Sequence, residues 1–312
     1  MNVLVAGGTG FIGRNLCAEL VQRGHDVTAL ARDPDDGGLP AAVETVAGDA
    51  SAYDSIAEIL ENGDYDAVVN LVSLSPLFQP PSGTSHEEVH YRGTENLVRG
   101  AEAGGVRRFV QISGLGADPD GATAFIRAKG RAEAVVGDSA LEWTIVRPSV
   151  VFGEGDEFVG FTKTLTTPYV TALPGGGGTR FQPIWVGDLV PMLADAVEDE
   201  DGEHADETYE LGGPEVLTLA EVAELAHEAD GRSVTVLPLP MALAKLGSHA
   251  IGPVPFVPFG PDQARSLEFD NTVSDNDVTA FGREPDDLLT LRSYLGLEST
   301  SAGSVESGIR SP

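Results

Sequence analysis

The beginning of the chain constrains its fold more than any other segment, because a short apolar run there leads directly into a glycine-rich turn. Residues 1–6 read MNVLVA, and Gly7, Gly10 and Gly13 follow in the spacing GxxGxxG before a segment of helical periodicity. In such a strand–turn–helix unit the first glycine permits the tight turn, the second lets the backbone approach a pyrophosphate, and the third lets helix and strand pack closely. The anion then lies on the helix N-terminus. The residues predicted to hold it are Gly7, Thr9, Gly10, Phe11, Ile12 and Gly13.

Strand-like and helix-like segments alternate through the first half of the chain. Strands are expected at residues 1–6, 26–31, 43–47, 67–72, 108–113 and 143–146, and helices at 53–60, 85–103 and 123–136. This alternation predicts an α/β fold with a doubly wound, mainly parallel sheet of the Rossmann type and right-handed crossovers. The ligand is then expected at the carboxyl edge of the sheet, beside the first glycine turn.

The regular alternation ends after Pro148, which predicts a second, smaller unit. We expect residues 1–153 to form the dinucleotide-binding domain, with residues 186–212 returning to it as a helix and a strand. Residues 154–185 and 213–296 are expected to form a smaller C-terminal lobe for a substrate or partner, in which Thr218 and Glu221 have the spacing of a helix capping box. Residues 297–312 are rich in Ser, Gly and Glu, a composition typical of a disordered tail.

The charge of the chain is strongly acidic, with 49 Asp and Glu against 19 Lys and Arg and a formal net charge of −30. Its only lysines are Lys129, Lys163 and Lys245. Concentrated salt screens self-repulsion of this size, so we interpret the composition as adaptation to a very salty cytoplasm. An acidic surface for a basic partner is the alternative. Nucleic acid is not an expected partner, because no basic stripe is present to neutralise phosphates.

The location predicted for the chain is cytoplasmic. The first strand begins at the N-terminus with no basic leader, and no uninterrupted apolar run reaches the roughly 18 residues of a membrane-spanning helix. Residues 241–259 are largely apolar but contain Lys245, His249 and several prolines and glycines. They are interpreted as lining the small lobe, with peripheral contact to a membrane or a partner subunit as the alternative.

The end of the second predicted strand indicates which nicotinamide cofactor is bound. An acidic residue there binds the ribose 2′-hydroxyl of NAD, whereas an arginine favours the 2′-phosphate of NADP. The strand ends in Ala31, Arg32 and Asp33, and Arg32 offers a guanidinium for the phosphate. We therefore predict NADP, and the alternative is NAD with Asp33 on the hydroxyl. Asp49, after the third strand, is a candidate acceptor for the adenine amino group, or else caps the following turn.

Residues 86–90 read HEEVH and formally match the zinc-protease pattern H-E-x-x-H. Ser85 and Glu88 also form a capping-box pattern, the two glutamates suit a helix N-terminus, and no obvious third ligand follows His90. We therefore predict a helix start at this motif and no metal. Zinc hydrolysis through His86 and His90 is kept only as a distant alternative.

The ordered succession of motifs resembles the short-chain dehydrogenase/reductase superfamily, in its extended and atypical branches. Besides the glycine turn, the matching segments are residues 48–49 (GD), 70–73 (NLVS), 93–97 (GTENL), 112–113 (IS), Lys129, 147–153 (RPSVVFG) and 183–188 (PIWVGD). Residues 209–214 (YELGGP) and 237–240 (LPLP) are most similar to the atypical group that includes the nucleotide-binding accessory subunit of respiratory complex I. The resemblance covers residues 1 to about 260. It implies further cofactor contacts from Ala50, Val72, Ser73, Lys129, Pro148 and Val150.

The resemblance also implies which residues would act in a reaction. Active members use a tyrosine for proton transfer, a lysine four residues later that lowers its pKa and holds the ribose, and a serine that orients the substrate. Ser113 and Lys129 match the serine and the lysine, but Phe125 stands at the tyrosine position and has no proton to give.

Two functions follow from these residues. The first is an NAD(P)(H)-binding protein with impaired or non-standard catalysis, which holds NADP(H) in an accessory role beside a membrane redox complex. The alternative is an active NAD(P)-dependent oxidoreductase or epimerase that uses Ser113 and Lys129. Its unknown small-molecule substrate would be quinone-like, isoprenoid or a nucleotide sugar.

Overall fold

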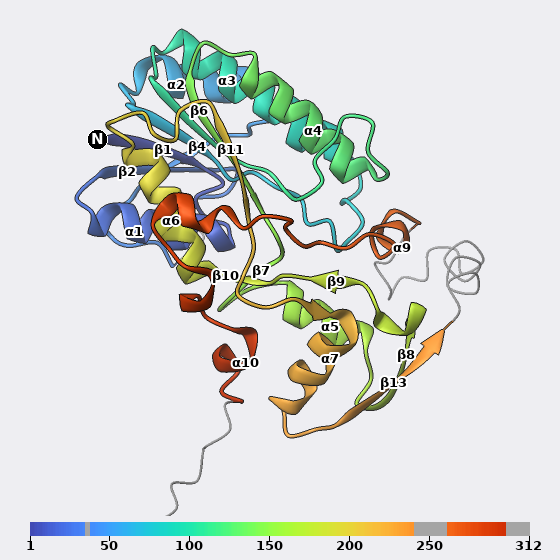
Figure 1. Ribbon diagram of the computed structural model, residues 1–312. Coiled ribbons are helices and arrows are strands. Elements are labelled where there is room, and N and C mark those ends of the chain that lie inside the picture. The colour runs from blue at the N-terminus through green and yellow to red at the C-terminus, as the bar shows by residue number, and fades with distance from the viewer. Residues whose placement is uncertain (35–37, 240–260, 298–312) are drawn as a thin grey trace, which may run out of the picture.

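The computed structural model describes residues 1–34, 38–239 and 261–297 of the chain. Its larger unit is built on a seven-stranded sheet in the order β11-β6-β5-β4-β1-β2-β3 (Figure 1). The strands are β1 Asn2–Ala6, β2 Asp26–Ala31, β3 Glu44–Ala47, β4 Ala67–Asn70, β5 Arg108–Ile112, β6 Glu142–Pro148 and β11 Glu207–Leu211. Every neighbouring pair in this sheet is parallel. The strand order reverses between β1 and β4, where folds of this class bind their ligand. The predicted doubly wound fold is confirmed.

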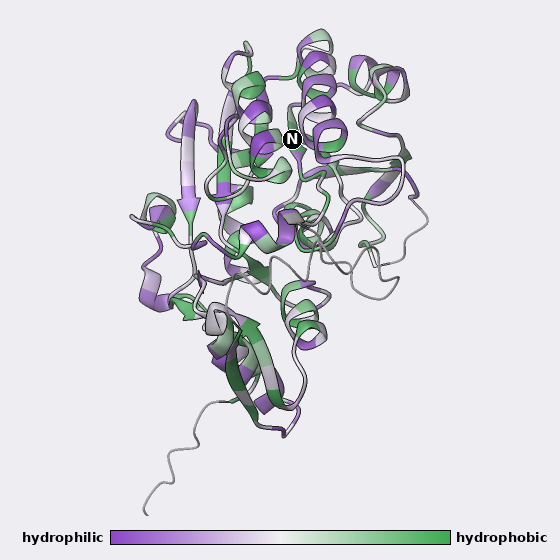
Figure 2. Cartoon of the chain, turned by 90° about the vertical axis from the view of Figure 1, so that its right-hand side faces the viewer, coloured by the Kyte–Doolittle hydropathy of each residue, from purple (hydrophilic) through white to green (hydrophobic). Residues whose placement is uncertain are grey.

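Helices cover both faces of this sheet. On one face α1 (Phe11–Gln22) and α6 (Val186–Glu198) pack with Val3 and Val5, and on the other α2 (Tyr53–Asn62), α3 (Gly93–Ala103) and α4 (Ala124–Gly137) pack with Leu4 and Ala6. Successive residues of β1 therefore point to opposite cores, as the period of two in a strand requires. The hydrophobic colouring of Figure 2 follows the sheet and the inner sides of these helices.

The smaller lobe contains α5 (Phe158–Leu165), β8 (Tyr169–Pro174), α7 (Leu219–Glu228) and β13 (Val234–Leu239), with β8 and β13 paired in parallel (Figure 1). Its own core joins Phe158, Leu173 and Val222. Shorter strands β7 (Val151–Phe152), β9 (Arg180–Phe181), β10 (Ile184–Trp185) and β12 (Leu217–Thr218) connect the two units. The predicted capping box is present, because Thr218 and Glu221 each bind the other's backbone N–H.

The C-terminal segment differs from the predicted domain boundary. After the short helix α9 (Pro261–Ser266), the 3₁₀ turn η3 (Asp277–Phe281) packs on the larger unit, where Val278 and Leu288 join the core beneath α1 and α6. Asp277 accepts a hydrogen bond from the N–H of Glu210 on β11. The turn η4 (Pro285–Asp287) and helix α10 (Leu291–Tyr294) follow. Residues 276–288 therefore return to the nucleotide-binding unit, which no local pattern in the sequence indicated.

The helix predicted at residues 85–103 is two elements. A π-helix, η1 (Glu87–Arg92), comes first and α3 follows from Gly93. Ser85 does cap the start, since its Oγ accepts from the N–H of Glu88 at 3.1 Å. π-Helices are rare and occur mostly as single turns, often at functional sites.

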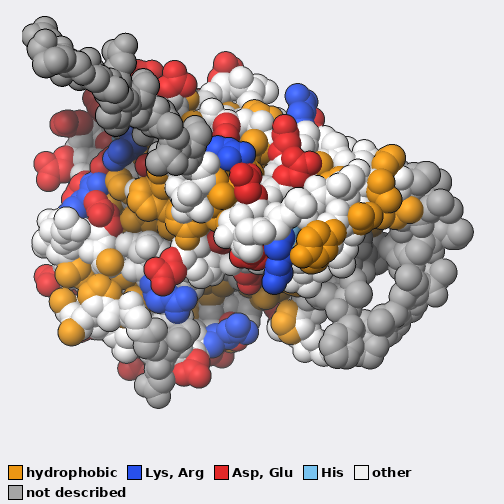
Figure 3. Space-filling view, turned by 90° about the horizontal axis from the view of Figure 1, so that it is seen from below, with side chains coloured by type: hydrophobic (Ala, Val, Ile, Leu, Met, Phe, Trp, Pro, Cys, Tyr) orange, Lys and Arg blue, Asp and Glu red, His pale blue; other side chains and the backbone are white. Residues whose placement is uncertain are grey.

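Acidic side chains are spread over the face shown in Figure 3. No helix among the described residues has the length and apolar character that crossing a bilayer demands. The apolar stretch 241–259 and nearly all of the predicted tail lie outside the residues that the structure describes.

Candidate dinucleotide site

The glycine turn between β1 and α1 has the geometry that a dinucleotide fold requires. Gly7 has φ +81°, its N–H donates to Leu30 O at 2.9 Å, and its carbonyl accepts from the N–H of Gly10 at 3.0 Å. A Cβ at Gly13 would lie 2.2 Å from the Gly7 oxygen, so no side chain fits there. The turn therefore depends on glycine for its backbone conformation at one end and for close packing at the other.

The N-terminus of α1 is open to an anion. No acidic side chain lies in its first turn and no side chain caps it. Within the described part of the chain, the N–H groups of Phe11 and Ile12 have no hydrogen-bond partner. Both side chains pack against the core beneath, and Thr9 is half-buried beside them. Free N–H groups and the helix dipole together favour a phosphate at this position.

The residues beyond β2 and β3 lie where the adenosine end of a dinucleotide would be held. Arg32 is exposed and has no ion-pair or hydrogen-bond partner among the described residues, and Asp33 beside it is also exposed. Asp49 Oδ1 accepts from the N–H and the hydroxyl of Ser51, which is the turn-capping role predicted as its alternative. Ala50 is buried, and its carbonyl accepts from the side chain of Asn96 at 2.9 Å.

The loop after β4 packs directly against the glycine turn. A Cβ at Gly7 would lie 3.0 Å from the carbonyl carbon of Leu71 and 3.1 Å from the nitrogen of Val72. Asn70 Oδ1 accepts from that same N–H of Val72 at 3.1 Å. Ser73 is exposed at the outer side of this loop. Val72 and Ser73, both predicted as cofactor contacts, thus lie next to the phosphate turn.

The three positions predicted to carry chemistry gather at the ends of β5 and α4. Lys129 is 2% exposed, and its Nζ donates to Ile112 O at 3.0 Å and lies 5.9 Å from the centre of the Phe125 ring. Burial lowers the pKa of this ammonium to about 8, although the charge of Glu133 opposes the shift. The Oγ of Ser113 is buried and has no hydrogen-bond partner among the described residues. Buried hydroxyl groups are usually hydrogen-bonded, so a polar group of a ligand would supply the partner that this oxygen lacks.

Two histidines flank Phe125, which motif reasoning did not foresee. The ring centres of His86 and His90 lie 5.6 and 5.3 Å from that of Phe125, and both histidines are buried. Burial lowers the pKa of each imidazole below its usual value, and the charge of Lys129 adds to the effect. No group of three or more potential metal-ligating side chains occurs in the described ranges.

Residues of the β6–β7 connection complete the predicted set. Pro148 is buried at the end of β6, and the N–H of Val150 donates to the side-chain oxygen of Asn271 at 3.1 Å. The same oxygen accepts from Ser149 Oγ at 2.8 Å. Asn271 therefore anchors this connection from a distant part of the sequence. Sequence reasoning also did not select Arg14, whose side chain reaches Gly38 in the loop beyond Arg32. Its Cδ lies 3.3 Å from the position that a Cβ on Gly38 would take.

A parallel sheet with this strand order, a bare glycine turn and an open helix N-terminus define a dinucleotide-binding protein. Comparison with known proteins names the family. A family model described as NAD(P)H-binding matches residues 7–167. The chain therefore belongs to the NAD(P)H-binding family, as an atypical member of the short-chain dehydrogenase/reductase superfamily related to subunits of respiratory complex I.

Individual relatives agree with this assignment. The chain is 32% identical to the mitochondrial NADH dehydrogenase 1 alpha subcomplex subunit 9 of Arabidopsis thaliana, covering 87% of this chain and 71% of that one. It is 27% identical to the NAD(P)H azoreductase of Xenophilus azovorans, covering 80% and 81%. Among solved structures, the UDP-glucose 4-epimerase of Thermus thermophilus in complex with NAD has a TM-score of 0.63 at 22% identity, covering 88% and 95%. The last of these shows the shared fold.

Proposed function

We propose that this protein binds NADP(H), with the diphosphate on the N-terminus of α1 and the 2′-phosphate on Arg32. The observation that carries the proposal is the free N–H groups above Gly10 together with an exposed Arg32 that has no ion-pair partner among the described residues. In a chain with a net charge of −30, Arg32 offers an exposed guanidinium next to the glycine turn, and this cation is available to the phosphate of a ligand.

The contacts of Asp49 bear on which cofactor is preferred. Asp49 already accepts two hydrogen bonds from Ser51. The exposed guanidinium of Arg32 favours a phosphate over a hydroxyl, since guanidinium matches phosphate in charge and geometry. The competing arrangement is NAD, with the Asp33 carboxylate on the ribose hydroxyl.

A nicotinamide cofactor, when bound, supplies or accepts a hydride, and the residues beside it decide whether a proton accompanies that step. Phe125 has no titratable group, so the usual proton donor is missing. Ser113 and Lys129 would bind and orient polar groups, with Lys129 toward the ribose hydroxyls. We therefore propose a binding protein in an accessory, assembly or sensing role, peripheral to a membrane redox complex in a salt-rich cytoplasm. The Arabidopsis relative named as an NADH dehydrogenase subunit supports this role.

A second candidate is an oxidoreductase, and two observations favour it. The buried Ser113 Oγ has no partner among the described residues, and the pKa of Lys129 is lowered to about 8, where an ammonium can donate a proton near neutral pH. The Xenophilus relative is named as an azoreductase. A quinone-like, isoprenoid or nucleotide-sugar substrate would then take the place next to Phe125.

Cofactor choice is tested by titrating the protein with NADPH and NADH in molar KCl and following nucleotide fluorescence. Arg32→Ala should weaken NADPH binding by about tenfold or more and leave NADH unchanged, because a charged hydrogen bond contributes about 1.5–3 kcal/mol. Arg107→Ala is the matched control, since Arg107 is also exposed but is paired with Glu142 and lies just before β5, at the amino-terminal end of the strands and away from the glycine turn. Equal loss for both nucleotides in Arg32→Ala would contradict the 2′-phosphate contact.

Turnover is tested separately with a panel of quinones, azo compounds and nucleotide sugars. A binding protein gives no steady oxidation of NADPH with any of them, and Phe125→Tyr does not create it. Steady turnover in the wild type that disappears in Lys129→Ala would instead establish the oxidoreductase.

A further inference from the structure

His90 connects the π-helix to the loop that follows β4. Its Nε2 accepts a hydrogen bond from the backbone N–H of Leu74 at 3.3 Å, and the side chain is 2% exposed. An imidazole nitrogen that accepts a hydrogen bond carries no proton, so the neutral ring holds its proton on Nδ1. That Nδ1 is buried and has no partner among the described residues. The contact to Leu74 is therefore the hydrogen bond that fixes this ring.

The loop that His90 holds is the one beside the glycine turn. Its first residue is tied to β1, where the Leu71 N–H donates to Ala6 O at 2.9 Å, and Val72 is tied to Asn70. Within the described residues, the next backbone N–H of this loop that donates a hydrogen bond is that of Leu74, and its acceptor is His90. Residues 71–74 are thus fixed at both ends, with Gly7 against the first half.

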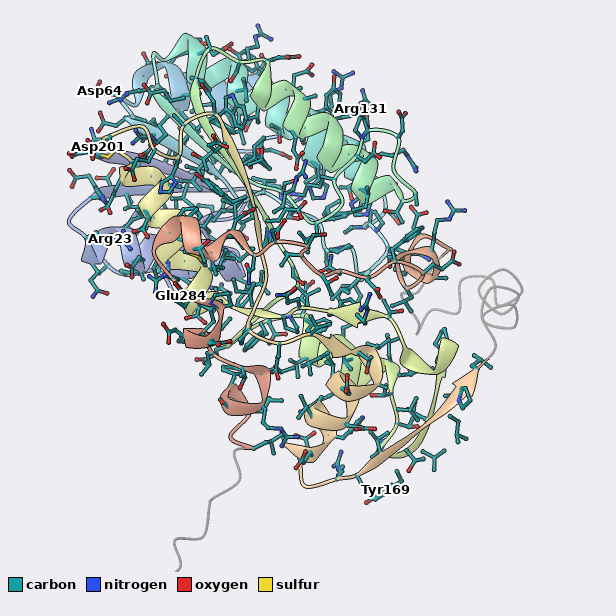
Figure 4. The ribbon with its side chains drawn as sticks, in the orientation of Figure 1. Arg23, Asp64, Arg131, Tyr169, Asp201 and Glu284 are labelled. Atoms are coloured by element: carbon teal, nitrogen blue, oxygen red, sulfur yellow. The ribbon has the colours of Figure 1, made fainter. Side chains whose placement is uncertain are left out.

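The π-helix brings His90 to this loop. Arg131, labelled on α4 in Figure 4, forms an ion pair with Glu87, which fastens the start of η1 to α4. His86 lies one turn before His90 with its ring centre 5.4 Å away, and it is also buried. The structure records no hydrogen bond from His86 to residues 71–74 among the described contacts. Both histidines are buried and contact Phe125, but among the described contacts only His90 forms a hydrogen bond with the backbone of the loop.

We propose that His90 is a positioning residue for the cofactor: through Leu74 it holds residues 71–74 against the glycine turn in the arrangement that receives the dinucleotide. This inference rests on the proposed NADP(H) site. The proposal gives the HEEVH motif at residues 86–90 a role that requires no metal. The hydrogen bond exists only while Nε2 is unprotonated, so protonation of His90 releases the loop.

The charges around His90 keep it neutral. Burial opposes a positive charge on His90, and so do the charges of Lys129 on α4 and of His86 at the N-cap of η1, so the pKa of His90 lies well below its usual value. The charge of the Asp262 carboxylate on α9 acts on His86, where it opposes the lowering of the pKa. Leu74 offers only an N–H. The hydrogen bond is therefore intact at neutral pH and is lost in acid.

The test measures NADPH affinity in molar KCl for the full chain and three variants. His90→Leu keeps an apolar side chain but no acceptor and should weaken binding by about tenfold. His90→Gln keeps an acceptor oxygen that does not titrate and should bind within about threefold of wild type. His86→Leu is the matched control, and it should bind as wild type does. Melting temperatures recorded in parallel separate loss of affinity from loss of folding.

A pH series gives the readout that a merely structural histidine would not move. Because the pKa of His90 lies well below its usual value, wild type and His86→Leu should lose more NADPH affinity than His90→Gln only once the pH falls below the ordinary titration range of imidazole. Protonation of the 2′-phosphate near about pH 6 affects all three proteins alike. Equal affinity losses in His90→Leu and His86→Leu, or the same pH profile in His90→Gln as in wild type, would overturn the inference. A wild-type chain that binds neither NADPH nor NADH would instead contradict the proposed function itself.

Discussion

Lys129 places an ammonium group inside the protein, where, among the described residues, it contacts one carbonyl oxygen and no carboxylate directly. Its Nζ donates to Ile112 O, and the side chain is 2% exposed. Burial lowers its pKa from 10.5 to about 8, with the charge of Glu133 acting against the shift. A fall of that size corresponds to about 3 kcal/mol of folding free energy at neutral pH. The residue is therefore costly to the fold, which is typical of functional positions.

Lys129→Met should consequently stabilise the protein while weakening its cofactor site. At pH 7 we expect a gain of about 1–2 kcal/mol, because removal of the buried charge outweighs the roughly 1 kcal/mol lost when the Ile112 carbonyl loses its donor. NADPH affinity should fall by about tenfold. Chemical denaturation and nucleotide titration measure the two effects.

The pH dependence of this gain has a definite sign. Because the pKa of Lys129 is lowered in the folded protein, its burial costs no stability above the unfolded value of 10.5, where the amine is neutral in both states. Stability is lost as the pH falls from 10.5 toward about 8, and the full cost is present below that value. The advantage of Lys129→Met should thus be largest below pH 8 and disappear near pH 10.5. Lys163→Met, which removes a partly exposed ion pair with Asp230, serves as the control and should change stability by less than about 1 kcal/mol at any pH. A variant less stable than wild type at pH 7 would contradict the argument.

Among the elements, α7 shows how a local signal starts a helix. Thr218 Oγ1 accepts from the N–H of Glu221 at 3.2 Å, and Glu221 accepts from the N–H of Thr218 at 2.7 Å. Two N–H groups that a helix leaves unpaired at its start are thereby satisfied. The helix packs Val222 into the core of the small lobe, so its start also fixes that core.

Thr218→Ala should destabilise the protein by about 1 kcal/mol, the usual cost of an N-cap. Thr164→Ala is the comparison, because Thr164 lies on α5 and its hydroxyl bonds only to Gly160 O within the same helix. We expect that variant to stay within about 0.5 kcal/mol of wild type. Urea denaturation in constant KCl measures both, and equal losses would show that the cap is not what matters.

The elements that sequence patterns predicted are those whose signals are local. Strands β1 and β2, the glycine turn and the capping box at Thr218 each depend on neighbouring residues, and all are present. The π-helix was missed because its residues have ordinary helical periodicity, and nothing in residues 87–92 themselves marks the extra residue per turn. The strands of the small lobe were missed because glycines and prolines mask their patterns. Residues 276–288 return to the main core through distant contacts, which no window of sequence contains.

In the candidate site, too, some residues could be predicted from the sequence, whereas contacts between distant segments could not. The resemblance to the superfamily was enough to select Ser113, Phe125 and Lys129, which the fold gathers near the ends of β5 and α4. The hydrogen bond from Leu74 to His90 joins the loop after β4 to η1, two segments that are 16 residues apart in the sequence, so no local pattern indicated it. In the structure, the two histidines of the HEEVH motif pack against Phe125, and His90 accepts a hydrogen bond from Leu74.

At the scale of the whole molecule, the balance of charges limits how the fold can be stabilised. Arg23 illustrates the shortage of cations, since this one guanidinium binds Glu19, Asp195 and Glu198. It joins α1 to α6 and so helps hold two helices of one sheet face together. Many other carboxylates have no cation available, because 49 acidic residues share 19 basic ones. Their mutual repulsion acts on the folded state more than on the expanded chain.

Salt should therefore stabilise this protein strongly. Raising KCl from 0.1 to 2 M shortens the screening length from about 10 Å to under about 3 Å, which removes repulsion between carboxylates on the surface. We expect the melting temperature to rise on the order of 10 °C, with most of the gain complete by about 1 M because screening saturates there. Calorimetry or circular dichroism across a KCl series measures it. Betaine at matched osmolality is the control, since it carries no net charge and should give a smaller rise that does not saturate. A melting temperature independent of KCl would mean that the acidic surface serves a basic partner instead, because a chain adapted to dilute solution has no need of screening.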